Sequence, residues 1–188
     1  MIKEYFTEIY NILIRLNIPD IQKVIDILAE LKGRLFILGV GGSAANASHA
    51  VNDFRKIANI EAYAPTDNVA ELTAWTNDED WDCVFVNWLK ESKLKKEDVI
   101  MILSVGGGSE TTSANLLDAV NFAKYEVGCK VVGIVSRLGG ITKRLADACI
   151  MIPVINDKHI TPHAEAFQAI LTHLIVENLR CLITENLK

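Results

Sequence analysis

The sequence predicts an α/β fold, a doubly wound domain in which helices cover both faces of a parallel sheet. Four short runs are apolar without alternation, at residues 34–40, 98–104, 130–136 and 148–153, which is typical of strands buried on both faces. Helical segments separate most of these runs, and that alternation indicates parallel strands joined by crossovers. Because no linker rich in Pro, Gly or Ser interrupts the pattern, residues 1–188 are expected to form a single domain.

Each element is assigned from its local pattern, in chain order. Residues 1–32 form an N-terminal helical segment of two amphipathic helices, divided at Pro19 and Asp20 and ended by Gly33. The next elements are a strand at 34–40, a helix of small residues at 44–57, a short strand at 61–64 and helices on the sheet edge within 66–97. After them come strand 98–104, helix 110–125, strand 130–136, a short helix after Gly140, strand 148–153 and a long helix at about 163–182.

Composition and charge exclude several functional classes. The net charge of −5 disfavours a nucleic-acid binder that works through a basic face, because neutralising phosphates requires clustered Lys and Arg. The N-terminus has no signal-peptide hydrophobic region, and no apolar run reaches the roughly 18 residues of a membrane span. We therefore expect a cytoplasmic protein that binds neither nucleic acid nor membrane. The four cysteines match no zinc-binding spacing, and Cys129 and Cys149 are expected to be small buried hydrophobes.

Two glycine-rich turns follow buried strands and predict a phosphate site. Such turns expose backbone N–H groups at the start of a helix, whose dipole also favours an anion, and serine hydroxyls add donors. Neither turn is a P-loop or a dinucleotide fingerprint. Glycine at a strand–helix turn can serve backbone geometry alone, but two such turns with serine favour phosphate binding. The predicted phosphate-binding residues are Gly41, Gly42, Ser43, Ser104, Gly106, Gly107 and Ser109.

His49 and Asp53 are four residues apart on a predicted helix, so their side chains share one face. That spacing suits two metal ligands, or a base and its partner. A pair of this kind is more often an ordinary helix-surface pair. Its position shortly after a predicted phosphate-binding turn favours a functional role.

At residues 39–53 the sequence GVGGSAANASHAVND resembles the first signature of the phosphoheptose (sedoheptulose-7-phosphate) isomerases. Further motifs at 66–68, 77–78, 104–109 and 139–140, and then the helix with His173, follow in the order of that family. The resemblance implies the sugar-isomerase (SIS) fold, a flavodoxin-like three-layer sandwich with a five-stranded parallel sheet. It also implies a homotetramer whose active sites lie between subunits and hold a sugar-phosphate substrate.

The same resemblance implies the roles of individual residues. Zinc would be bound by His49, Asp53, Glu165 and His173, with proton transfer by Asp53 and His173 and a sugar hydroxyl contacted by Asp78. Two ligand positions depart from the family, which has Glu at position 53 and Gln at position 165. Glu165 and His173 are eight residues apart, about 12 Å on an ideal helix. They converge only if Glu165 precedes the regular helix or belongs to another subunit, and His163 is an alternative ligand.

The implied activity is an aldose–ketose isomerisation of a sugar phosphate through an enediol or enediolate, most simply of sedoheptulose 7-phosphate. Two alternatives stay open. One is an isomerase of another sugar phosphate, and the other is a non-catalytic SIS protein that binds a phosphosugar or a partner, resembling the replication-initiator-associating protein. The loop after residue 104 departs from the family, because Val105, Gly106 and Gly108 stand where the family has polar residues. This departure leaves the identity of the sugar phosphate open.

Overall fold

A five-stranded parallel sheet in the order β2-β1-β3-β4-β5 runs through the middle of the protein. The computed structural model describes residues 1–185. The strands are β1 (Leu35–Gly39), β2 (Ala62–Tyr63), β3 (Val99–Ser104), β4 (Lys130–Val135) and β5 (Ala148–Met151). The helices are α1 (Ile2–Leu13), α2 (Ile18–Ala29), α3 (Gly42–Lys56), α4 (Val69–Asp78), α5 (Val84–Glu91), α6 (Ala114–Asn121), α7 (Gly140–Leu145) and α8 (Ile160–Glu185). Shorter helical pieces are η1 (Pro65–Asp67), the π-helix η2 (Phe122–Val127) and η3 (Asp157–His159).

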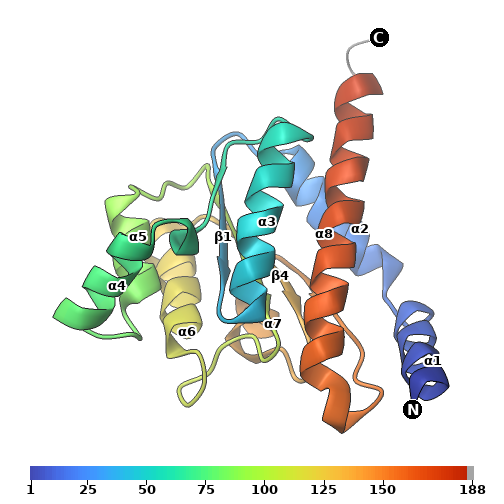
Figure 1. Cartoon of the computed structure of the whole chain (residues 1–188). Helices are drawn as coiled ribbons and strands as arrows, with labels where there is room; N and C mark the ends of the chain where they lie inside the picture. The colour runs from blue at the N-terminus through green and yellow to red at the C-terminus, as the bar shows by residue number, and fades with distance from the viewer. Residues whose placement is uncertain (186–188) are drawn as a thin grey trace.

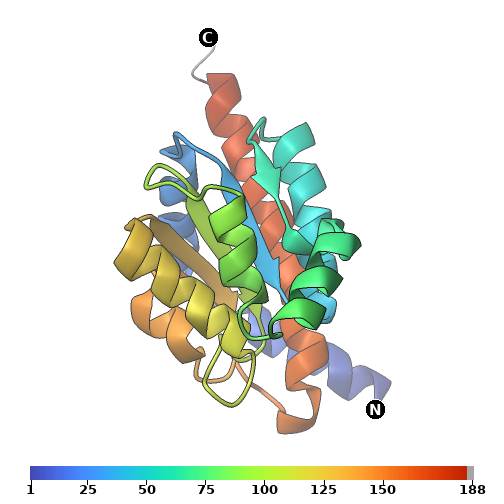
Figure 2. The same cartoon turned by 90° about the vertical axis from the view of Figure 1, so that its left-hand side faces the viewer.

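Helices cover both faces of the sheet, so the predicted three-layer α/β architecture is confirmed (Figures 1 and 2). Successive residues of a strand point to opposite faces. In β1, Leu35 and Ile37 pack in the core under α2, α3 and α8, whereas Phe36 and Leu38 pack in the core under α5 and α6. Because both faces are covered, every residue of β1 and β3 is buried, and this explains the continuous apolar runs in the sequence.

The helix predicted at 110–125 has a different start. Ser109 and Thr112 form an antiparallel bridge, and Ser113 adopts a left-handed conformation with φ of 55°, so α6 begins only at Ala114. The helix then continues as the π-helix η2. The last helix begins at Ile160, three residues earlier than expected. Pro162 is tolerated in its first turn because the N–H groups there have no partner within the helix, so the missing N–H of proline costs no hydrogen bond.

Of the helices within 66–97, α5 packs on a face of the sheet, so the prediction that it lies on the sheet edge was wrong, whereas α4 has no buried residue and packs against α5. The indole of Trp88 on α5 meets the ring of Phe36 edge to face at 5.5 Å, directly over β1. Trp88 is buried, Trp75 is half-buried and Trp81 is exposed. The reason is that α5 carries Val84, Phe85, Trp88 and Leu89 on one side, which the sheet face buries.

Cys129 and Cys149 are buried, as the sequence predicted. Burial raises the pKa of Cys129 to about 12 and that of Cys149 to about 11, so both remain protonated thiols at neutral pH. Among the described residues, no helix combines the length and the apolar character that crossing a membrane requires.

Candidate functional site

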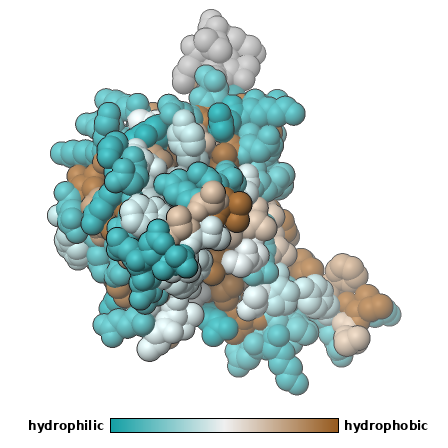
Figure 3. Space-filling view, turned by 60° about the vertical axis from the view of Figure 1, so that its left-hand side comes forward, coloured by the Kyte–Doolittle hydropathy of each residue, from teal (hydrophilic) through white to brown (hydrophobic). Residues whose placement is uncertain are grey.

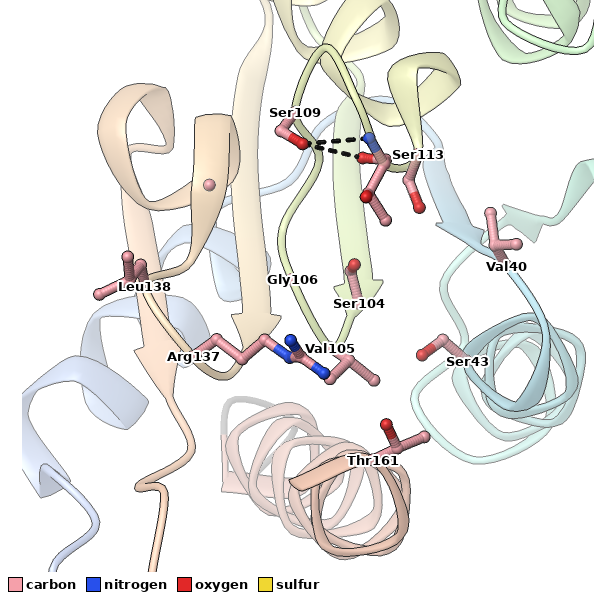
Figure 4. A pocket seen from close by; sticks show the side chains of 12 residues that line it. Val40, Ser43, Ser104, Val105, Gly106, Ser109, Ser113, Arg137, Leu138 and Thr161 are labelled. Carbon is pink, nitrogen blue, oxygen red and sulfur yellow. Dashed lines mark hydrogen bonds between the residues drawn. The ribbon is translucent and has the colours of Figure 1, made fainter. Parts of the chain in front are cut away.

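A pocket of about 490 Å³ opens at the carboxyl ends of the central strands (Figure 4). The chain passes from β1 to β2 on one side and then returns to β3 on the other, so strand order reverses between β1 and β3. In open α/β sheets, that reversal leaves a crevice in which ligands bind. The pocket is lined by Val40, Ser43, Ser104, Val105, Gly106, Ser109, Thr112, Ser113, Arg137, Leu138, Gly140 and Thr161.

Serine hydroxyls from both predicted turns reach this pocket. In Figure 4 the side chains of Ser43, Ser104 and Thr161 point toward the same space. The Oγ of Ser104 accepts a hydrogen bond from Gly107 N at 3.0 Å, and this leaves the hydroxyl proton of Ser104 free to be donated to a ligand. Ser109 Oγ accepts a hydrogen bond from Thr112 N at 3.2 Å and donates one to the Thr112 carbonyl at 3.4 Å, so its proton is used within the loop. The pocket therefore presents hydroxyl donors beside the start of α3.

Gly107 has a structural role that differs from the predicted phosphate contact. It has a φ of +77°, and a Cβ there would lie 2.0 Å from the carbonyl oxygen of Gly139. The carbonyl of Gly107 accepts hydrogen bonds from the hydroxyl of Thr142 at 2.8 Å and from its backbone N–H at 3.1 Å. The loop after β3 is thereby held against the loop after β4. Gly106, by contrast, lines the pocket and has open space around it.

Arg137 is a pocket residue that the sequence reasoning missed. It lies two residues after the end of β4 and has a φ of 51°, and Figure 4 shows its side chain extending across the pocket toward Val105. Among the residues that the structure describes, Arg137 has no acidic side chain within ion-pair distance, so its charge is available to an anion. The signal in the sequence was a lone arginine at the end of a buried strand, directly before Leu-Gly-Gly.

The His49 and Asp53 pair lies on α3 and meets α8, which runs beside α3 (Figure 1). Asp53 is buried, and its Oδ2 lies 3.4 Å from His49 Nε2 and 3.2 Å from His173 Nδ1. The two imidazoles are about half exposed, with ring centroids 5.1 Å apart. The structure therefore brings together three of the four predicted metal ligands, from two helices.

The spacing of these three groups fits a tetrahedral metal ion. Bonds of about 2.0–2.1 Å to zinc place neighbouring ligand atoms about 3.3 Å apart. The distances from Asp53 Oδ2 to the two ring nitrogens, 3.4 and 3.2 Å, fall on either side of that value, and all three ligand atoms lie within 4.8 Å of one another. Three protein ligands with one open position are the usual pattern of a catalytic zinc site.

Glu165 lies elsewhere along the same pair of helices. Its carboxylate lies against Gly42, where a Cβ would come within 2.4 Å of Glu165 Cδ. Because α8 is a regular helix from Ile160 onward, Glu165 is about 12 Å along its axis from His173. Asn46 lies between the two positions and donates a hydrogen bond to the Glu165 carbonyl at 2.8 Å. Within one chain, Glu165 is outside the His49, Asp53 and His173 cluster.

The other predicted residues lie near the pocket or away from it. Gly41 and Gly42 form the turn that starts α3, but their atoms are not among those that line the pocket. Asp78 is exposed at the end of α4, where it accepts a hydrogen bond from Asn77 at 2.7 Å, and it does not line the pocket.

Comparison with known proteins places this geometry in context. The SIS domain family model matches residues 4–136. The chain is 31% identical over 163 residues to the probable phosphoheptose isomerase of Thermoplasma acidophilum, covering 78% of this chain and 86% of that protein. It is 32% identical over 176 residues to the phosphoheptose isomerase of Helicobacter hepaticus, covering 89% of this chain and 85% of that protein.

The fold is also found among solved structures. The phosphoheptose isomerase from Neisseria gonorrhoeae superposes with a TM-score of 0.80 at 24% sequence identity, and the match covers 95% of this chain and 97% of that one. At this level of identity the likeness concerns the fold.

Proposed function

The chain belongs to the SIS-domain phosphoheptose isomerase family, and we propose that it interconverts a ketoheptose 7-phosphate and an aldoheptose 7-phosphate. The observation that carries the proposal is the placement of two sites along α3. The Gly/Ser pocket with Arg137 lies at its N-terminal end, and His49 and Asp53 follow farther along the same helix.

The distance between the two sites selects for a long substrate. Ser43 and His49 are six residues apart on α3, or about 9 Å along the helix axis. A ligand that holds its phosphate at the pocket and its carbonyl at the histidines must be extended. This requirement favours a heptose phosphate over a triose phosphate.

In the pocket, the phosphate is held by hydroxyls and one cation. Ser43 and Ser104 supply hydroxyl donors, and the guanidinium of Arg137 supplies a charge-assisted pair. The start of α3 adds a favourable dipole. Glu165 brings a negative charge to the same end of α3, and this charge repels a phosphate. The positive charge of Arg137 is therefore more important here than it would be if a neutral Gln stood at position 165.

At the other site, Asp53 and His173 carry the proton transfers. One group removes the proton from C1 of the ketose while a proton is delivered to O2, which gives an enediol. Return of a proton to C2 and loss of the O1 proton then give the aldose. A carboxylate 3.2 Å from an imidazole suits this shared work. Zinc held by His49, Asp53 and His173 would polarise the carbonyl, and with the ion bound the proton transfer would fall to the Asp53 carboxylate oxygen that does not bind it.

We also propose a homotetramer with active sites between subunits. Its support is the N-terminal helix α1 with the residue that follows it, Ile14: the side chains of Ile2, Phe6, Tyr10, Leu13 and Ile14 are all more than half exposed. Figure 3 shows hydrophobic residues gathered on the projection at lower right, where Figure 2 places the N-terminal helix. An exposed apolar face of this kind is typical of an interface.

The direct test is turnover of sedoheptulose 7-phosphate by the purified chain, followed by NMR with and without added zinc. We expect aldose formation, and we expect Asp53→Asn to reduce its rate at least about 100-fold, the lower range for loss of an acid–base group. Asp26→Asn, an exposed change on α2, should have no effect. Sugar-phosphate binding without any turnover in the unaltered chain would instead identify a binding protein, and no binding at all would reject the phosphate site.

A further inference from the structure

Glu8 on α1 lies between two histidines that come from the other end of the chain. Its Oε2 is 2.7 Å from His159 Nδ1 and 2.7 Å from His163 Nε2. His159 ends η3 and His163 lies in the first turn of α8, so the two rings are separated by one helical turn. From this arrangement we propose a second metal site, in which Glu8, His159 and His163 bind a divalent transition-metal ion and join α1 to α8.

The carboxylate of Glu8 is held in the form that binds metals. Its side chain is only 13% exposed, and Asn156 donates a hydrogen bond to its Oε1 at 2.7 Å. A glutamate is ordinarily ionised at neutral pH, and the hydrogen bond from Asn156 fixes the orientation of this carboxylate, as outer partners of metal ligands do.

His163 offers its Nε2 to the site from a buried position. The residue is 3% exposed, and its Nδ1 has no hydrogen-bond partner among the described residues. Nδ1 is the ring nitrogen that faces away from Glu8, so an ion at this site would bind Nε2, and the neutral ring would carry its proton on Nδ1. Tyr5 covers both rings, with centroids 4.5 Å from His163 and 5.3 Å from His159, and limits the access of water.

The geometry needs only a small adjustment to accept an ion. Ligand atoms around tetrahedral zinc lie about 3.3 Å apart, so the two 2.7 Å contacts must each open by about half an ångström. Rotation of the Glu8 side chain is enough for a change of this size. Two imidazoles and one carboxylate suit zinc, cobalt, nickel or iron and do not suit calcium or magnesium. A water molecule would complete the coordination.

This site is separate from the one on α3 and stands whether or not the chain is an isomerase. His49 and His173 contribute nothing to it, and Glu8, His159 and His163 contribute nothing to the other cluster. The two can therefore be tested apart. Because His49 and His173 are about half exposed, replacing both with alanine removes the first cluster at little risk to folding.

The experiment titrates Co²⁺ into the full chain carrying His49→Ala and His173→Ala, with the visible absorption of four-coordinate cobalt as the readout. We expect one ion to bind per chain. Adding Glu8→Gln or His159→Gln should weaken binding at least about tenfold, because even an outer hydrogen-bond partner contributes 10–100-fold to metal affinity. Glu4→Gln, an exposed change on the same helix, is the matched control and should leave the affinity unchanged.

Two results would overturn the site. One is the absence of a bound ion in the His49→Ala and His173→Ala background, and the other is an affinity unaffected by both Glu8→Gln and His159→Gln. Circular dichroism of each variant confirms that it is folded. His163 is left intact in these variants because it is buried, and its loss would combine a packing defect with the loss of a ligand.

Discussion

Arg137 shows how much a single residue contributes to the pocket. It is the one basic side chain among the described residues that line the pocket, and its left-handed backbone lies two residues after the end of β4. The serine hydroxyls around it are neutral donors, and two of them already accept hydrogen bonds from the loop itself. The charge that distinguishes a phosphate from a neutral sugar therefore comes mainly from Arg137 and from the start of α3.

Replacing Arg137 with Gln should weaken the binding of the sugar phosphate without changing the chemical step. A hydrogen bond to a charged group contributes about 1.5–3 kcal/mol, which corresponds to a loss of about 10- to 100-fold in kcat/KM. The loss should appear in KM, because the phosphate is bound equally in the ground and transition states. Arg144→Gln, an exposed change on α7 outside the pocket, is the control, and an equal effect of both changes would argue against a specific role.

At the scale of elements, the loops after β3 and β4 act as one unit. The carbonyls of Gly107 and Gly108 accept backbone hydrogen bonds from Thr142 and Ile141 at the start of α7. This contact places Gly106 and Arg137 on the same side of the pocket. The glycines of the two loops therefore divide into one that packs, Gly107, and one that faces the ligand, Gly106.

The comparison of Gly107→Ala with Gly106→Ala tests this division. Gly107→Ala should reduce the free energy of unfolding by at least about 2 kcal/mol, because it combines positive-φ strain with a clash against Gly139. Gly106→Ala should leave that free energy nearly unchanged, since its Cβ would meet open space. Denaturant unfolding measures both values, and equal values would show that the loops are not locked as described.

Asp147, in the turn before β5, gives a pH-dependent contribution at the opposite end of the sheet. Burial alone would raise its pKa, but the backbone N–H of Val131 and the ammonium groups of Lys124 and Lys130 lower it overall. Because the folded pKa is below the ordinary value of 3.8, the stabilisation is present above that pH. It is lost as the pH falls through the lower folded pKa.

Asp147→Asn should therefore reduce the free energy of unfolding at pH 7 by about 0.5–1 kcal/mol, a modest value because solvent screens the two lysines. Near pH 2 the difference between the variant and the unaltered chain should shrink. Chemical unfolding at both pH values measures it. A difference that stays constant with pH would mean that packing, and not charge, explains the effect.

At the scale of the whole molecule, the pairing of α3 and α8 sets the distance between the two parts of the proposed site. The helices contact along Gly42 and Glu165, then Asn46 and Gln168, then Asp53 and His173. Polar groups therefore follow one line from the pocket to the histidines. In one chain both imidazoles are half exposed, which leaves room for a second subunit to complete the site.

The exposed apolar face of α1 predicts that the chain forms a tetramer through this helix. Light scattering after gel filtration should give a mass four times the 20.8 kDa of the chain. Phe6→Ser combined with Tyr10→Ser should shift the mass toward smaller species, because both side chains are at least 60% exposed and apolar contact is lost. Tyr125→Ser, which removes an exposed aromatic from η2, is the control. A mass unchanged by the α1 substitutions would place the interface elsewhere.

The sequence by itself determined the features whose signals are local. Buried strands read as apolar runs, glycines mark the turns that follow them, and the four-residue spacing of His49 and Asp53 places both on one face of a helix. The order of motifs identified the family and brought His173 into consideration. Only the tertiary structure decided that Glu165 lies at Gly42, that Arg137 enters the pocket, and that Glu8 meets His159 and His163 across 151 and 155 residues. The physical reason is that helix and strand patterns depend on neighbours within a turn or two, whereas such contacts depend on how whole elements pack against one another.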